Sequence, residues 1–258
     1  MSRTFTRREA IHAVGAISAL AAAGTAHAAP KPAPLVPIVT SGGTRLYATW
    51  IWPQWWTTQP IANLTWTLPS DQLTQPTPLY VTGGYASIGA QTIPDGSTSV
   101  QDVRNTSNHG VFTRAYVQMI TKQLDGPQTL GGTVSLAVHC LQWHRRIGAV
   151  LALQVAVHRP DGLIRAMALP VARSNVDFSL GTWRTRAVVN WPLQAVAAED
   201  GDVIAVNLGI WADNQTRTLA QGVGFWIYAD QALDITHVDS DAPGNTWVEF
   251  SSAPIFRP

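Results

Sequence analysis

Tryptophan is concentrated in one short segment of the sequence, and its indole rings offer the clearest binding chemistry. Trp50, Trp52, Trp55 and Trp56 lie within seven residues, and Trp66 follows soon after. Exposed indole rings stack on sugar rings or become buried against another protein chain. We therefore predict a ligand-binding surface formed by Trp52, Trp55, Trp56 and Trp66. The alternative is that Trp50 and Trp52 share one strand face and pack into a core.

Histidine and aspartate side chains provide a second kind of chemistry, the binding of a metal ion. His139 and His158 offer nitrogens that suit a transition metal, whereas Asp239 and Asp241 offer oxygens that suit Ca²⁺. No H-x-H, H-E-x-x-H or C-x-x-C motif is present, so we predict no cofactor with a definite ligand set, and Ca²⁺ or a transition metal stays open. A metalloprotein would draw its ligands from His109, His139, His158 and His237.

Groups that could act in catalysis are scarce. After residue 28 the sequence contains only two glutamates, Glu199 and Glu249, whereas a glycosidase needs two carboxyl groups across a cleft. The single cysteine, Cys140, excludes an intrachain disulfide, and its apolar alternating surroundings favour burial over a catalytic thiol. We assign no catalytic residue, and a non-enzymatic role is favoured over an enzyme.

The charge of the chain excludes some classes of partner. Only 13% of the residues are charged and the formal net charge is +1. This composition lacks the high net charge of a disordered chain and the basic surface that neutralises nucleic-acid phosphates. Arg184 and Arg186 share one face of an expected strand, where we predict an exposed basic stripe that protects a sheet edge.

Residues 1–28 have the pattern of a twin-arginine export signal. Arg7 and Arg8 form the arginine pair, an apolar stretch runs from Ala13 to Ala23, and Ala26-His27-Ala28 offers a cleavage site. The alternative is an N-terminal helix that docks on the domain. This leader carries three arginines against one glutamate, so its removal changes the net charge from +1 to −1. We predict export to the periplasm or the cell exterior, with no membrane span after processing.

Alternation of apolar and polar residues dominates the remainder of the chain. In 133–143, 149–158 and 203–211 every second residue is apolar, and turn signals such as Pro160-Asp161-Gly162 separate the runs. We therefore predict one all-β domain over 44–258. It is expected to be an antiparallel two-sheet β-sandwich, jelly-roll-like, with about ten strands.

Two regions depart from this alternation. Residues 29–43 are rich in proline and are predicted to form an extended tether before the domain. Residues 69–111 are polar and rich in turn signals, so we predict long loops there. Loops of that length inside a compact domain are usually functional or mobile.

Several segments, taken in order, resemble a loosely defined group of β-sandwich proteins encoded in bacteriophage and phage-like metagenomic sequences, regarded as virion structural components. The matching segments are Arg45-Leu46-Tyr47, Arg114–Val117, Gln128–Val134, Glu199–Gly209 and Asn245–Ser251. The resemblance implies the sandwich fold and a surface or assembly role, and it transfers no catalytic residue. The export leader and the tryptophan-rich segment depart from that pattern.

Three functions follow from these observations. The first is an exported, non-catalytic β-sandwich with a structural, assembly or surface-binding role, expected to form a homo-oligomer because a surface with few charges favours burial against a partner. The second is a secreted carbohydrate-binding module or glycan-active enzyme that uses the exposed tryptophans. The third is a secreted metalloprotein with a histidine site.

Overall fold

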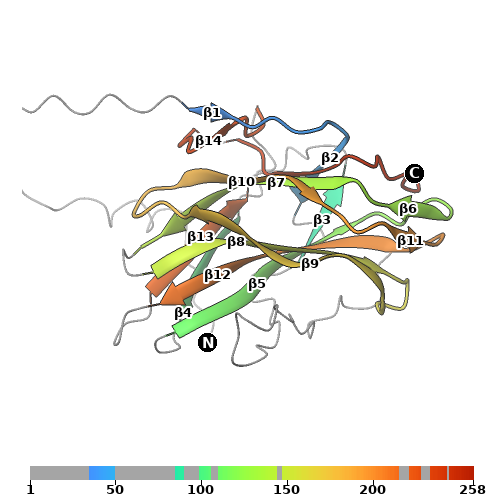
Figure 1. Ribbon diagram of the computed structural model, residues 1–258, viewed down its shortest axis with the longest axis horizontal. Coiled ribbons are helices and arrows are strands. Elements are labelled where there is room, and N and C mark those ends of the chain that lie inside the picture. The colour runs from blue at the N-terminus through green and yellow to red at the C-terminus, as the bar shows by residue number, and fades with distance from the viewer. Residues whose placement is uncertain are drawn as a thin grey trace, which may run out of the picture. The chain divides into compact units, whose positions relative to one another are not determined.

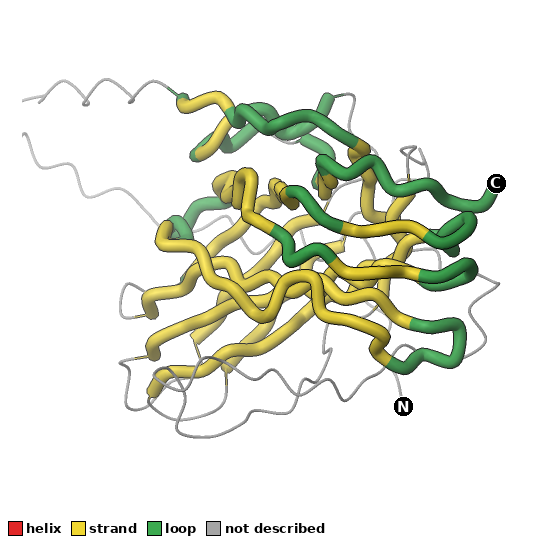
Figure 2. The backbone as a smooth tube through the Cα atoms, turned by 45° about the vertical axis from the view of Figure 1, so that its right-hand side comes forward, coloured by secondary structure: helices red, strands yellow, loops and turns green. Residues whose placement is uncertain are grey.

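The computed structural model describes residues 35–49, 85–89, 99–105, 110–143, 147–214, 221–227, 233–242 and 244–258. All regular structure within these ranges is β-strand, which confirms the predicted all-β fold class (Figure 2). No helix in this part of the chain has the length and apolar character that a membrane-crossing helix needs.

Fifteen strands lie within the described ranges, and most pairs of neighbours are antiparallel. In chain order they are β1 (Val36–Pro37), β2 (Thr44–Thr49), β3 (Tyr85–Gly89), β4 (Ser99–Asn105), β5 (Gly110–Thr121), β6 (Gln128–Leu130), β7 (Thr133–Gln142), β8 (Ile147–His158), β9 (Ile164–Asp177), β10 (Arg184–Pro192), β11 (Val196–Ala198), β12 (Val203–Asn214), β13 (Gln221–Ile227), β14 (His237–Val238) and β15 (Trp247–Phe250). The pairing of β3 with β5 is parallel, whereas the other ladders between the described strands are antiparallel, as predicted.

Eleven of these strands belong to one hydrogen-bonded sheet that folds over into two layers (Figure 1). One layer contains β10, β7, β15 and β2, and the other contains β5, β12, β8 and β9, with β3 joining them. β13 and β15 both pair with β7, β13 along Gln142–His139 and β15 along Ala137–Val134. Among the described strands of this sheet, β4, β9 and β10 each pair with one neighbour, so β9 and β10 are edge strands, one in each layer.

The main core lies between the layers and uses the residues that alternation placed inside. Leu136 from β7, Leu153 and Val155 from β8, and Val206 and Leu208 from β12 belong to this one cluster and are almost fully buried. Burying each such side chain stabilises the fold by about 1.5–3 kcal/mol. The inward set predicted from the sequence is confirmed for these strands.

The outward faces of the central strands are also buried, contrary to simple alternation. His139 on β7, Gln154 on β8 and Asn207 on β12 are each at most 3% exposed. On the β7 side the cover is a short ribbon of β1 and β14, where Val36 pairs with Val238. Ile235 and Trp247 form a second apolar cluster beneath this ribbon.

Two regional predictions differ from the observed chain path. Strands β3 and β4 and the start of β5 lie within 69–111, where long loops were expected, because single-sequence patterns do not reveal strands paired with distant partners. Part of the 29–43 tether is held against the domain, since Ile38 N donates to Thr236 O at 2.8 Å. The predicted leader at 1–28 lies outside the described residues.

Candidate functional site

Several residues predicted to bind a ligand lie outside the described ranges. Trp52, Trp55, Trp56 and Trp66 all belong to this set, as does His109. The glycan surface and any metal site that uses His109 therefore remain predictions.

The other candidate metal ligands are histidines and aspartates that do not gather into a metal site among the described residues. His139 and His158 are each 2% exposed, and burial lowers the pKa of both, that of His139 to about 4. His158 Nδ1 lies 3.1 Å from the carbonyl oxygen of Gly162. Among the described residues, no group of three or more His, Cys, Asp or Glu side chains is arranged to hold a metal ion. Cys140 is a free, buried thiol, as expected.

Asp239 and Asp241 form ion pairs with the arginines of β10. Asp239 pairs with Arg186, and Asp241 Oδ2 lies 3.4 Å from Arg184 Nη1. The predicted exposed stripe of Arg184 and Arg186 is wrong for Arg186, which is only 6% exposed. The loop after β14 covers this arginine, and a cover supplied by residues some fifty positions later in the chain cannot be read from a strand pattern.

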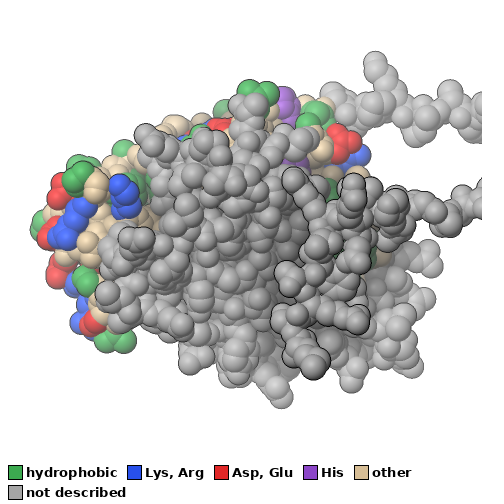
Figure 3. All heavy atoms as spheres, turned by 180° about the vertical axis from the view of Figure 1, so that it is seen from behind, with side chains coloured by type: hydrophobic (Ala, Val, Ile, Leu, Met, Phe, Trp, Pro, Cys, Tyr) green, Lys and Arg blue, Asp and Glu red, His purple; other side chains and the backbone are tan. Residues whose placement is uncertain are grey.

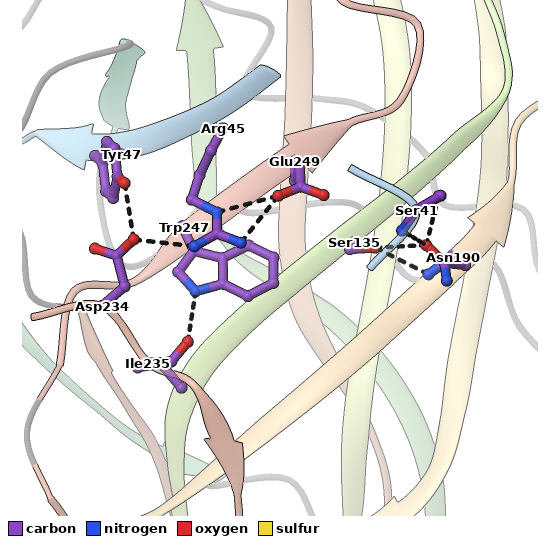
Figure 4. A network of polar contacts seen from close by, with 9 residues as sticks. All are labelled: Ser41, Arg45, Tyr47, Ser135, Asn190, Asp234, Ile235, Trp247 and Glu249. Atoms are coloured by element: carbon purple, nitrogen blue, oxygen red, sulfur yellow. Dashed lines mark hydrogen bonds and ion pairs between the residues drawn. The ribbon is translucent and has the colours of Figure 1, made fainter. Parts of the chain in front are cut away.

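A second charged cluster lies on the outer face of β2 and β15 (Figure 4). Arg45 donates from Nε and Nη2 to Glu249 Oε2 at 3.1 and 2.9 Å, and from Nη1 to Asp234 Oδ2 at 3.0 Å. Its guanidinium lies 4.2 Å from the ring centroid of Trp247. Burial lowers the pKa of Arg45, but the two carboxylates outweigh it, so this pKa lies above its ordinary value.

Both carboxylates of this cluster are engaged in structural bonds. Asp234 also accepts a hydrogen bond from the hydroxyl of Tyr47 at 2.8 Å, and burial together with this bond raises the pKa of Tyr47. Asn245 Nδ2 donates to the second oxygen of Asp234 at 3.3 Å. The cluster therefore ties the segment before β14 to the sandwich, and it leaves neither oxygen of Asp234 free to take a proton from a substrate.

Exposed and half-buried aromatic and apolar side chains gather where β7 turns toward β8 and β9 turns into β10. We call this surface, made of Trp143, Val176, Leu180 and Trp183, the apolar end. Trp143, Val176 and Leu180 are 43%, 43% and 51% exposed. The rings of Trp143 and Trp183 meet edge to face, with centroids 6.4 Å apart.

Backbone bonds hold Leu180 beside Trp143 at the apolar end. Gln142 N donates to Ser179 O at 2.9 Å, and Gly181 N donates to Gln142 O at 2.8 Å. Gly181 has φ +67°, a conformation that favours glycine. This geometry presents the Leu180 side chain on a fixed turn.

The buried Arg186 fixes the same turn from beneath. Its Nε donates to Asp177 O at 2.6 Å and its Nη2 donates to Ser179 Oγ at 2.8 Å. Because the guanidinium links the end of β9 to the loop that carries Asp239, the apolar end is a rigid surface rather than a loose loop.

A groove of about 690 Å³ opens between two edge strands of the sheet, β9 and β10. β9 pairs with β8 and β10 pairs with β7. Among the described residues, no hydrogen-bonded ladder joins β9 to β10. The Gln194 N to Ala168 O bond, 2.7 Å long, joins the two layers at one end of β9, and Arg186 joins them at the other. The lining is mostly apolar and includes Leu169, Ala172, Val176, Val188, Trp191 and Pro192.

The opposite end of β8 and β9 carries charged side chains, and Figure 3 shows acidic and basic groups side by side near β6 and β11. Arg165 donates to both oxygens of the fully buried Asp202, at 2.5 and 3.1 Å. Asp202 Oδ2 also accepts the backbone N–H of Glu199 at 2.7 Å. Arg257 pairs with Asp200 nearby. We call this set, Arg165, Glu199, Asp200, Asp202 and Arg257, the charged end.

The apolar end and the groove were not predicted from the sequence. Trp183 and Leu180 lie at the entry to an expected strand, and their exposure depends on where β9 ends. A Leu-Gly-Thr-Trp segment between two strands, at 180–183, is the one local signal, because a turn with two large apolar residues is unusual.

Comparisons with known proteins add weak likenesses of fold. No protein-family model matches the sequence, and no curated protein matches it either. A CocE/NonD family hydrolase from Staphylococcus aureus is 10% identical over 59% of this chain and 36% of its own, with a TM-score of 0.34. The VP2 protein of infectious bursal disease virus, from T=1 particles, is 12% identical over 65% of this chain and 42% of its own, with a TM-score of 0.24.

A structure of the Gx strain of the same virus is 11% identical over 63% of this chain and 40% of its own, with a TM-score of 0.23. The chain thus spans less than half the length of these structures. These likenesses support no specific function.

Proposed function

We propose that this chain is an exported structural protein that assembles with copies of itself through the apolar end. The observation that supports the proposal is the exposure of Trp143 and Leu180, at 43% and 51%, on a turn that Arg186 holds rigid. Large apolar patches on rigid surfaces are typical of protein–protein contacts. A rigid patch also loses little conformational entropy on association.

Export is the second part of the proposal. Its support is the sequence of the leader, with Arg7 and Arg8 before an apolar stretch and the Ala26-His27-Ala28 cleavage pattern. Assembly after export places the apolar contact in a compartment where copies of the chain meet at the cell exterior or in the periplasm.

The test is the mass of the chain in solution, after secretion by its own leader, measured by light scattering at about 10 to 100 µM. We expect a discrete oligomer for the wild type and a monomer for Leu180→Asp, because a carboxylate in the contact cannot be desolvated cheaply. Leu163→Asp is the matched control, since Leu163 is 53% exposed at the charged end. A monomeric wild type, or equal loss of mass in both variants, contradicts the proposal.

A further inference from the structure

We propose that the groove between β9 and β10 binds the N-terminal arm, residues Leu35–Val39, of a second copy of this chain. This inference rests on the proposed self-association and names the segment that enters the groove. Both partners are made of described residues, and both expose apolar side chains to water.

The arm has the chemistry of a segment that docks on another surface. Leu35, Val36 and Val39 are 48%, 62% and 71% exposed, whereas Ile38 between them packs against the domain. The sequence reads Pro34-Leu35-Val36-Pro37, a P-x-x-P spacing. Prolines favour an extended conformation before binding, so little chain entropy is lost when such a segment docks in a groove lined by aromatic residues.

The groove offers the matching surface. Trp191 and Pro192 on β10 lie opposite Leu169, Ala172 and Val176 on β9. The arm carries no charged residue from Leu35 to Val39, so it brings no charge that a mostly apolar lining would desolvate. Since Val176 belongs both to the groove and to the apolar end, an arm in the groove extends the same contact surface.

The arm is fixed on its own domain in a way that directs it to another copy. Val36 and Pro37 pair with β14, and Ser41 Oγ donates to Asn190 Oδ1 at 2.7 Å. While these pairs hold, Val36 and Pro37 stay on β14 of their own chain, and Val36 is 62% exposed. A contact of the arm of one copy with the groove of another joins two different surfaces. Such a contact builds a closed ring or an open chain of copies, unless two copies exchange arms and form a dimer.

The first experiment titrates a labelled peptide of residues 29–39 into the secreted chain and follows fluorescence anisotropy. We expect saturable binding that weakens at least tenfold when the peptide carries Val36→Asp and Val39→Asp. It weakens equally when the protein carries Pro192→Asp, an exposed groove residue, but not when it carries Pro160→Asp, an exposed proline of the β8–β9 turn. The inference is overturned if the affinity is the same for the wild-type pair, the variant peptide, the Pro192→Asp protein and the Pro160→Asp protein.

The second experiment mixes two full chains, one with Val39→Asp in the arm and one with Pro192→Asp in the groove. Each variant alone loses the wild-type mass, and the mixture regains a two-chain species because it contains one intact arm and one intact groove. Loss of assembly in Leu180→Asp together with wild-type mass in both of these variants leaves self-association standing and overturns the arm. A peptide that binds while the wild type stays monomeric overturns the self-association on which the inference rests.

Discussion

Near the turn from β8 to β9 a buried ion pair, Arg165 with Asp202, holds the chain, whereas where β9 turns into β10 large apolar side chains are exposed to water. Arg165 and Asp202 satisfy each other beneath the first turn, and Trp143 and Leu180 remain exposed at the second. Leu163 is exposed at the charged end too, but its backbone N–H is bound by Asp161 in a turn that also holds an ion pair. The comparison indicates that one end stabilises the fold and the other is left for a partner.

The largest expected effect on stability comes from removing Asp202 at the charged end. Asp202→Ala leaves the guanidinium of Arg165 and the backbone N–H of Glu199 without this acceptor, so we expect the largest loss of unfolding free energy among these variants. Urea denaturation measures the loss. Asp161→Ala, which removes an exposed ion pair with Arg159 and the acceptor of the Leu163 N–H, should cost only about 1 kcal/mol. Equal costs for the two variants would remove the stabilising role assigned to the charged end.

Acid should weaken the fold through His139 before it affects Asp200 at the charged end. The pKa of His139 is about 4 in the folded chain and 6.5 in the unfolded chain, so the unfolded chain binds the extra proton. Stability therefore falls as the pH drops from 6.5 toward 4, by at most about 3 kcal/mol for this histidine. His158, whose pKa is also lowered by burial, changes stability in the same direction.

The pH range in which Asp200 contributes to stability lies lower. A hydrogen bond from the backbone N–H of Gly126, together with Arg257, lowers the pKa of Asp200 below its ordinary value of 3.8, so its contribution is lost only under stronger acid. Unfolding free energies measured at several pH values should give a shallower slope between pH 6.5 and 4 for His139→Gln than for the wild type. Identical slopes would show that His139 does not titrate as its burial requires.

The smallest expected change in stability is at the apolar end. Trp143→Ala removes an exposed ring and its edge-to-face contact with Trp183, and we expect a loss of about 1 kcal/mol or less. Self-association should weaken at least tenfold, since tryptophan is a frequent hot spot of protein contacts. Sedimentation over a range of concentrations measures the association. A variant that is much less stable yet associates as the wild type does would reverse the assigned roles of the two ends.

The sequence was sufficient for the part of the fold that depends on local alternation. Leu136, Val155 and Val206 lie inside as expected, because a two-residue period directs them to one face whatever the strand pairing. Gln154 and Asn207 occupy the opposite face, where alternation predicts water, but they are buried and joined by a 2.8 Å hydrogen bond. Cover by distant segments has no local signature.

The same limit explains why the candidate surface was missed. The sequence pattern predicts that Arg186 is a solvent-exposed strand residue. In the structure the loop that carries Asp239, more than fifty positions away, covers Arg186, whose guanidinium donates to Ser179 in the turn. Arg45 and Asp234, 189 positions apart, form a second such bond. Exposure of Leu180 depends on these pairings, whereas the sequence reveals only its type.

The most direct test of the contact surface is hydrogen exchange of the wild-type chain at low and high protein concentration. The account predicts that amides of 178–184, at the apolar end, exchange more slowly in the concentrated sample, because assembly covers this turn. Amides of 159–165, at the charged end, should exchange at the same rate in both samples. Protection confined to 159–165, or no dependence on concentration at 178–184, would contradict the account.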